Sequence, residues 1–582
     1  MSITGRFLKI LMGFRITLMA LAACFLVSSV LIGTVFAPRG FTSGDDWTIM
    51  AGSILGHYSS CIATNYQIPW RSLQPTSVCL AYWLSGLNVD GLFMASIIAY
   101  ALAAFAWYGI VRNLFKLSAW IALLIGLLYL AYPDSGVRFT LTHATRMTGG
   151  TLTLYGVWLI LEYWDRPATV KLIGACILAL LGFATYEMLF VVWVVGLPLA
   201  LLYKSRRFSR RWLAQTAVIF AVALVYLAWR FLVLPTTYGD QTFIFGAHEI
   251  AISIPTIFHQ LIDSYLLTGQ LWIHLVLDFR GAVNDLNVVH TPQIITISVL
   301  TGLLTALLVW LVYRAELRIP PPTPKQGRLF FWGMLLFIPI FSGTFFATSD
   351  LNFLTDTYRS FGTTFAISVG VVGLLILLTT PRLFGLVATT LTVVMIVVQA
   401  AWVGYSDYNW RDYQAPGCDF FLRLTDTFPH LPPNLYVILK PKEVPALPDF
   451  FNDAYMLTPF YAALYDEGSF TPEAFDYGHM GYNGYLMFAA PDASFTPDGI
   501  ALQWPTYVGI IHRGAPLPDL APYDQTLMIA YAPNQTLDIL WQPPQLNALE
   551  RSLSINNPQP SRAQNLARQY CSWYTPPPQS ND

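Results

Sequence analysis

The chain has 582 residues, of which 55% are hydrophobic and 11% charged, and its formal net charge is -1. Soluble domains carry about a quarter charged residues, so this composition excludes an ordinary soluble protein. A net charge near zero also provides no basic field for nucleic acid. We therefore expect an integral membrane protein with membrane lipids, and no nucleic acid, among its partners.

Apolar stretches long enough to cross a bilayer recur up to about residue 403. Applying the usual length of about 18 residues gives roughly eleven spans. They lie near residues 12–36, 91–111, 118–133, 149–163, 168–186, 188–203, 212–234, 293–313, 329–347, 360–379 and 383–403. The main groups of basic residues that flank the spans, densest over 204–211, fall on one side, which predicts a cytoplasmic N-terminus and an external tail. We expect the first span to stay as an anchor, because Pro38 disfavours cleavage after it.

The predicted fold is an all-α polytopic membrane domain over 1–404 followed by an extracytoplasmic domain over 405–582. Two long outer loops, 37–90 and 235–292, interrupt the spans, and we expect helices that lie on the membrane surface in both. The tail alternates strand-like runs such as 435–439 and 507–511 with turn signals, which predicts an α/β or β-rich domain. Its proline-rich end is expected to be disordered.

Four of the six cysteines fall in predicted outer segments, two in the first loop and two in the tail. Outside the cytoplasm cysteines tend to be oxidised. The sequence therefore predicts two disulfides, although free thiols are the alternative: Cys61–Cys79 and Cys418–Cys571.

Two adjacent aspartates, Asp45 and Asp46, directly follow the first span. Vicinal carboxylates repel each other and gain nothing from nearby lipid, so a use for them is a reasonable hypothesis. Gly44 allows a tight turn and Trp47 can anchor the loop at the interface. We interpret Asp45 as a general base and Asp46 as its orienting neighbour. The plainer interpretation is a solvated loop start or a helix N-cap.

The same pair is the only metal site that the sequence suggests. With His57 the two carboxylates would suit Mg²⁺ or Mn²⁺. No set of zinc ligands is present in the sequence. We expect no obligatory cofactor.

The arrangement of an entering helix, an acidic pair in a long first outer loop, short-looped helix pairs and a soluble tail resembles the GT-C superfamily of integral-membrane glycosyltransferases. Protein O-mannosyltransferases and aminoarabinose transferases belong to it. The resemblance implies a base at Asp45 or Asp46, a sugar donor on a polyprenyl phosphate or pyrophosphate, and a glycan, lipid or protein acceptor. The pair here is Asp-Asp, where O-mannosyltransferases have Asp-Glu, and the tail lacks the Trp-Trp-Asp-Tyr-Gly motif of oligosaccharyltransferases.

A lipid phosphate needs cations on the outer side, where they are uncommon. We favour Arg71 and Arg359 for this role, with Tyr358 stacking on the sugar. Further candidates lie between the third and fourth spans: Arg138, His143 and Arg146. The alternative for each is an interfacial side chain with no ligand.

Glu187 is an acid at the outer tip of a helical hairpin with almost no loop. Ionisable groups at membrane depth are candidates for function, and in the related enzymes a charged residue at a comparable hairpin lies close to the donor. The alternative is an exposed turn residue.

Two other functions are compatible with the chain: a transporter or lipid flippase, and a non-catalytic envelope scaffold. Transporters place ionisable groups near the bilayer midplane, whereas the acids here gather at the ends of spans. The sequence thus favours a transferase in a bacterial inner or plasma membrane, with its chemistry outside.

Overall fold

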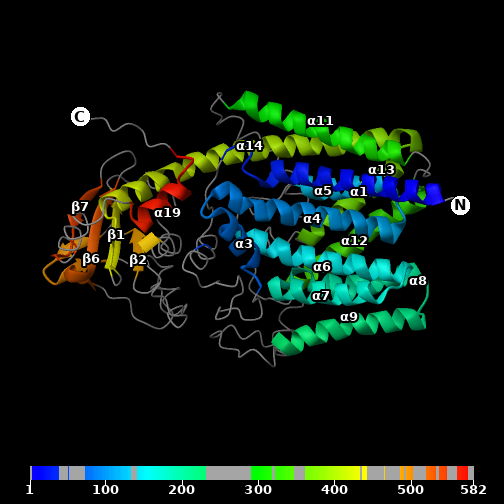
Figure 1. Cartoon of the computed structure of the whole chain (residues 1–582), viewed down its shortest axis with the longest axis horizontal. Helices are drawn as coiled ribbons and strands as arrows, with labels where there is room; N and C mark the ends of the chain where they lie inside the picture. The colour runs from blue at the N-terminus through cyan, green and yellow to red at the C-terminus, as the bar shows by residue number, and fades with distance from the viewer. Residues whose placement is uncertain are drawn as a thin grey trace.

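The computed structural model describes most of the helical region and the central part of the tail. The described residues are 3–37, 50, 73–132, 141–230, 290–316, 322–346, 361–432, 435–441, 464–465, 485–489, 493–502, 520–531, 537–544, 546 and 560–574. Within them the chain is mostly helical, with two small sheets near the C-terminal end. Figure 1 shows the long helices side by side, with the sheets beyond one end of the bundle.

Every predicted span overlaps a helix of the described part. These helices are α1 (Ile3–Ile32), α4 (Val89–Phe115), α5 (Ala119–Ala131), α6 (Leu141–Asp165), α7 (Thr169–Thr185), α8 (Leu197–Ser205), α9 (Arg210–Ala228), α11 (Thr291–Ala315), α12 (Pro324–Phe346), α13 (Phe361–Leu378) and α14 (Pro381–Thr427). Five of the described helices are long and apolar enough to cross a membrane by length and composition, and several shorter ones are also apolar. The helices share one apolar core.

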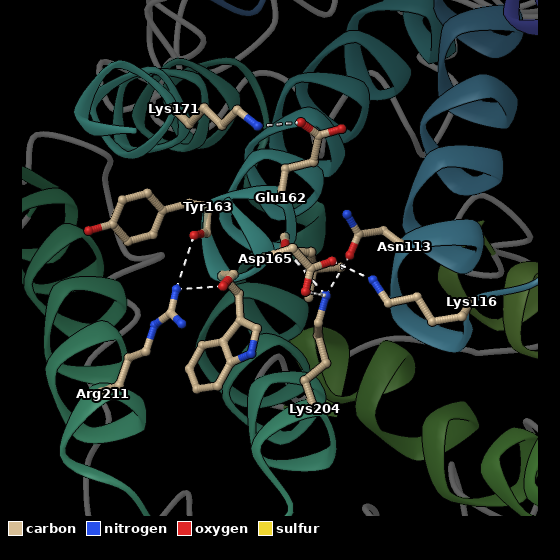
Figure 2. A network of polar contacts seen from close by, with 10 residues as sticks. Asn113, Lys116, Glu162, Tyr163, Asp165, Lys171, Lys204 and Arg211 are labelled. Atoms are coloured by element: carbon tan, nitrogen blue, oxygen red, sulfur yellow. Dashed lines mark hydrogen bonds and ion pairs between the residues drawn. The ribbon is translucent and has the colours of Figure 1, made fainter. Parts of the chain in front are cut away.

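One end of the bundle carries a network of ion pairs, which Figure 2 shows, and we call it the basic end. Asp165, the last residue of α6, accepts from Lys116 after α4 and from Lys204 of α8, the latter at 2.9 Å. Lys204 also donates to the Asn113 side chain of α4 at 2.6 Å. A neighbouring pair, Lys171 with Glu162, joins α7 to α6 at 2.8 Å. The network thus joins four helices, α4, α6, α7 and α8, at one end of the bundle.

Glu316 fastens α5 to α4 at the basic end. Its carboxylate accepts from the Arg112 guanidinium at 3.2 Å and from the backbone N–H of Ala119, the first residue of α5. Ser118, the N-cap of α5, provides no side-chain cap of its own. A carboxylate distant in sequence therefore accepts a hydrogen bond from a backbone N–H in the first turn of α5, where the residues before the helix provide no side-chain cap.

The helix α14 continues well beyond residue 404, where the sequence predicts the membrane domain to end, and carries the chain into the tail (Figure 1). The tail has a four-stranded sheet of order β2-β1-β6-β7 and a three-stranded antiparallel sheet of order β3-β4-β5. The strands are β1 (Leu435–Pro441), β2 (Tyr485–Ala489), β3 (Ser494–Thr496), β4 (Gly499–Ala501), β5 (Leu520–Ala521), β6 (Thr526–Tyr531) and β7 (Asp538–Trp541). Because β1 pairs in parallel with both β2 and β6, the tail is α/β in character.

A disulfide and a hydrogen bond to a buried aspartate fix the tail to the end of α14. Cys418 is bonded to Cys571, with Cα atoms 5.5 Å apart, which is the tail pairing that the sequence predicts. Next to it Asp419 pairs with Arg423 at 2.8 Å and accepts from the hydroxyl of Tyr574 at 3.4 Å. Burial raises the pKa of Tyr574 to about 12, so this hydroxyl keeps its proton at physiological pH.

The tail also packs on the end of the first outer loop. The short helix α3 (Thr76–Ser85) precedes α4, and the backbone N–H of Leu87 donates to the Gln569 side chain of α19 (Arg562–Tyr570) at 3.3 Å. Met50 and Phe93 belong to the same buried cluster as aromatic residues of the tail. We call this end of the bundle the tail end. On α3 the side chains of Trp83 and Leu84 are exposed, which agrees with the interfacial helix expected there.

Candidate anion site at the tail end of the bundle

The candidate site lies where α6 begins and α7 ends. The two helices approach closely because glycines face each other: a Cβ on Gly182 would lie 2.8 Å from the carbonyl oxygen of Gly149. Small residues permit such contacts between membrane helices. After Thr185 the chain turns through the extended residue Tyr186 into one 3-10 turn, Glu187–Leu189. This tight turn presents Tyr186 and Glu187 beside the start of α6.

Two arginines and one glutamate meet at this turn, and with Tyr186 they form what we call the arginine cluster (Arg146, Tyr186, Glu187 and Arg230). A carboxylate oxygen of Glu187 lies 3.6 Å from a guanidinium nitrogen of Arg230, which follows α9. Both side chains are largely buried, with 14% of Glu187 and 17% of Arg230 exposed. Arg146 of α6 lies over the ring of Tyr186, with its Cζ 5.6 Å from the ring centre. The cluster thus carries an excess of one positive charge.

An aromatic pair extends the site along α6. His143 is buried, and its ring centre lies 5.9 Å from that of Tyr100 on α4. Since His143 is one turn from Arg146 on the same helix, the two side chains lie on the same face of α6.

The first outer loop is anchored at the same place. The backbone N–H of Leu73 donates to the carbonyl of Ala184, next to the last residue of α7, at 3.1 Å. The loop therefore ends beside the turn that carries Glu187.

Of the residues singled out from the sequence, the structure brings together His143, Arg146 and Glu187. Cys79 is disulfide-bonded. The remaining predicted site residues lie outside the described ones: Asp45, Asp46, His57, Cys61, Arg71, Arg138, Tyr358 and Arg359. Among the residues that the structure describes, no group of three His, Cys, Asp or Glu side chains could hold a metal ion. The suggested metal ligands are among those not described.

The sequence analysis missed Arg230. Arg230 falls inside the predicted span 212–234. A single cation near the end of an apolar span is the sequence feature that could have identified it. Its partner could not be read from the sequence, because Glu187 and Arg230 meet only through the packing of α7 against α9.

A second polar group at the tail end was also missed, on α11 and α14. The rings of His290 and Tyr408 stack with centres 3.9 Å apart, and the Tyr408 hydroxyl donates to Gln293 at 3.1 Å. Asp407, beside Tyr408, is fully buried. Gly404, one turn earlier on α14, packs against Phe36 at the end of α1. These groups therefore lie near the point where the chain enters its first outer loop.

Comparison with known proteins gives no family assignment. No protein-family model matches the chain, and no curated protein matches its sequence. Two solved structures are similar, both of ArnT from Cupriavidus metallidurans. The form bound to undecaprenyl phosphate is 16% identical, covers 79% of this chain and 86% of its own, and has a TM-score of 0.37. The apo form is 16% identical, covers 76% and 84%, and has a TM-score of 0.35. At these scores the likeness carries no argument, so the proposal below rests on the residues of this chain.

Proposed function

We propose that the protein is a membrane glycosyltransferase that moves a sugar from a polyprenyl-phosphate-type donor to an acceptor at the tail end of the bundle. The observation that carries the proposal is the arginine cluster, where Arg230 pairs with Glu187 and Arg146 lies over the ring of Tyr186. Ionisable groups in an apolar bundle are costly and mostly serve a ligand or a pathway. Guanidinium groups suit phosphate oxygens in charge and in geometry.

We propose that the aspartate pair acts at this end of the molecule. Ala37 and Met50 flank the segment that contains Asp45 and Asp46, and both are buried. Met50 belongs to the buried cluster shared with the tail. Asp46 precedes Met50 by four residues, which is at most about 14 Å of extended chain. Likewise Arg71 is two residues, or at most about 7 Å of chain, from the anchored Leu73.

These residues divide the steps of a sugar transfer between them. Asp45 takes the proton of the acceptor hydroxyl while that oxygen attacks the anomeric carbon. The bond between the anomeric carbon and the phosphate oxygen breaks, and its electron pair remains on the leaving polyprenyl phosphate. Arg146 and Arg230 stabilise the charge that develops on that phosphate. Glu187 holds Arg230 in position.

The same scheme assigns roles to the remaining candidates for donor and metal binding. Arg71 and Arg359 are further phosphate ligands, and Tyr358 stacks on the sugar. Asp46 orients Asp45, and Asp45, Asp46 and His57 would hold Mg²⁺ or Mn²⁺ if such an ion binds. The acceptor is a glycan, a lipid or a protein.

Binding of undecaprenyl phosphate to the purified full-length protein, followed by native mass spectrometry, tests the arginine cluster. A hydrogen bond to a charged group contributes about 1.5–3 kcal/mol, so Arg146→Gln and Arg230→Gln should each weaken binding about 10- to 150-fold. The control is Arg207→Gln, an exposed arginine at the basic end, which should bind like the parent. Equal binding by all four proteins would refute a phosphate site in the cluster.

A deletion strain distinguishes the transferase from a scaffold. Loss of one envelope glycan or glycolipid, restored by the parent gene, is the expected result. Unchanged envelope sugars would contradict the proposal.

A further inference from the structure

A wholly apolar cavity lies within the bundle, between α4, α6, α8, α12 and α13. Every residue that lines it is apolar, including Trp107, Phe115 and Phe365. The cavity has a volume of about 70 Å³. On the same measure one water-sized group needs roughly 10–15 Å³, so the cavity has room for several such groups. A water molecule in a cavity also needs two to four polar partners. An apolar wall without polar partners therefore favours a hydrocarbon group over water in this space.

The local structure of two helices keeps the cavity open. Between α7 and α8 the chain forms a π-helix, Val192–Gly196, directly before Pro198 at the start of α8. Proline has no N–H to complete the α-helical pattern of the preceding turn, and wider π turns arise where that pattern is broken. Val192 and Gly196 of this π-helix line the cavity.

On the opposite wall, Gly333 of α12 faces empty space. A Cβ added there would meet nothing within 4 Å. At other glycines of α12 and α13, neighbouring residues occupy the space that a Cβ would take. A Cβ on Gly373, for example, would lie 2.7 Å from Phe330. The gap at Gly333 is thus a local feature of a hairpin that is otherwise closely packed.

The cavity extends toward the basic end, where unpaired cations lie. Its wall includes Leu329, and Lys325 lies one turn before Leu329 and two turns before Gly333 on the same stripe of α12. Lys325 and its neighbour Arg328 are both exposed, and neither forms an ion pair with any residue in the described part of the chain. Lys116 and Lys204, by contrast, both form an ion pair with Asp165.

We propose that this cavity binds one acyl chain of an anionic phospholipid whose phosphate lies against Lys325 and Arg328. The chain matches the apolar wall, and the headgroup matches the two cations, which attract anionic lipids at a membrane surface. A polyprenyl donor fits this position less well, because the arginine cluster proposed for its phosphate lies at the other end of the bundle. The site does not depend on the transferase proposal.

Native mass spectrometry of the purified full-length protein, titrated with phosphatidylglycerol, tests the site. Gly333→Leu places a side chain in the cavity at a position where a Cβ meets nothing within 4 Å, and it should abolish the retained lipid. The matched control is Gly13→Leu on α1, where an added Cβ also meets nothing within 4 Å, and this variant should bind like the parent. Equal retention by Gly333→Leu and the parent would overturn the proposal.

A second variant tests the headgroup and does not alter the core. Replacing Lys325 and Arg328 together by glutamine should weaken phosphatidylglycerol binding about 30-fold, at about 1 kcal/mol for each cation, and leave phosphatidylcholine binding unchanged. An equal effect on both lipids would contradict the charge argument. Stronger retention of undecaprenyl phosphate than of phosphatidylglycerol, lost in Gly333→Leu, would assign the cavity to the donor chain and overturn the proposal.

Discussion

Substitution of Gly182 by alanine tests whether the close contact of α6 and α7 positions the arginine cluster. The added Cβ would lie 2.8 Å from the carbonyl oxygen of Gly149 and 3.0 Å from the backbone nitrogen of Thr153. These are backbone atoms, so relief requires the helices to separate. Overpacking of this kind costs about 1–3 kcal/mol. Because the turn after α7 carries Tyr186 and Glu187, the separation should also disturb the cluster.

Gly174 on the same helix provides the matched control. A Cβ there would make an ordinary contact with Leu159 at 3.4 Å, and alanine in a helix interior is favoured over glycine by about 0.5–1 kcal/mol. We therefore expect Gly174→Ala to raise the thermal unfolding temperature slightly and Gly182→Ala to lower it by several degrees. Gly182→Ala should also weaken binding of undecaprenyl phosphate. Equal stability and equal binding of the two variants would refute the packing argument.

Three further changes test the tail and the basic end. Reduction of the disulfide, or its replacement by serines at Cys418 and Cys571, should cost about 2–5 kcal/mol and speed limited proteolysis of the tail; an unchanged cleavage rate would contradict its role. Glu316→Gln should destabilise the protein by about 1–3 kcal/mol in denaturant unfolding, because it leaves buried donors poorly satisfied, whereas Glu162→Gln at a more exposed pair should cost less than about 1 kcal/mol. Tyr531→Phe should cost about 1 kcal/mol in thermal unfolding, because the Tyr531 hydroxyl donates to the backbone carbonyl of Pro416 in α14 at 2.9 Å. An unchanged stability would exclude that hydrogen bond as a stabilising contact.

The helices could be predicted from the sequence because hydropathy is a local property. The apolar stretches in α4 and α11 are long and uninterrupted. In the bilayer core the backbone N–H and C=O groups of such a stretch must bond to one another, which favours a helix. The domain boundary expected at residue 404 was placed where the apolar run ends. The helix itself continues to Thr427, and its polar continuation is held to the tail by the Cys418–Cys571 disulfide and by the Tyr574 hydroxyl on Asp419.

The site could be predicted only in part, because its contacts are not local. His143, Arg146 and Glu187 were visible as polar residues at the ends of apolar spans. Arg230 was not, since its importance depends on a partner more than 40 positions away that only the packing of α9 against α7 identifies. The contact of the tail with the first outer loop, from Leu87 to Gln569, spans 482 positions and leaves no pattern in the sequence.

The measurement that tests the central claim most directly is the level of the envelope glycan or glycolipid in strains that carry Asp45→Asn or Asp46→Asn. Removal of a general base slows transfer about 10²- to 10⁴-fold, so Asp45→Asn should reproduce the deletion strain, with a smaller effect for Asp46→Asn. The control is Asp412→Asn, whose side chain is 61% exposed and should leave the product unchanged. Normal product in Asp45→Asn and Asp46→Asn, at normal protein levels, would contradict the assignment of a first-loop aspartate as the base of a glycosyltransferase.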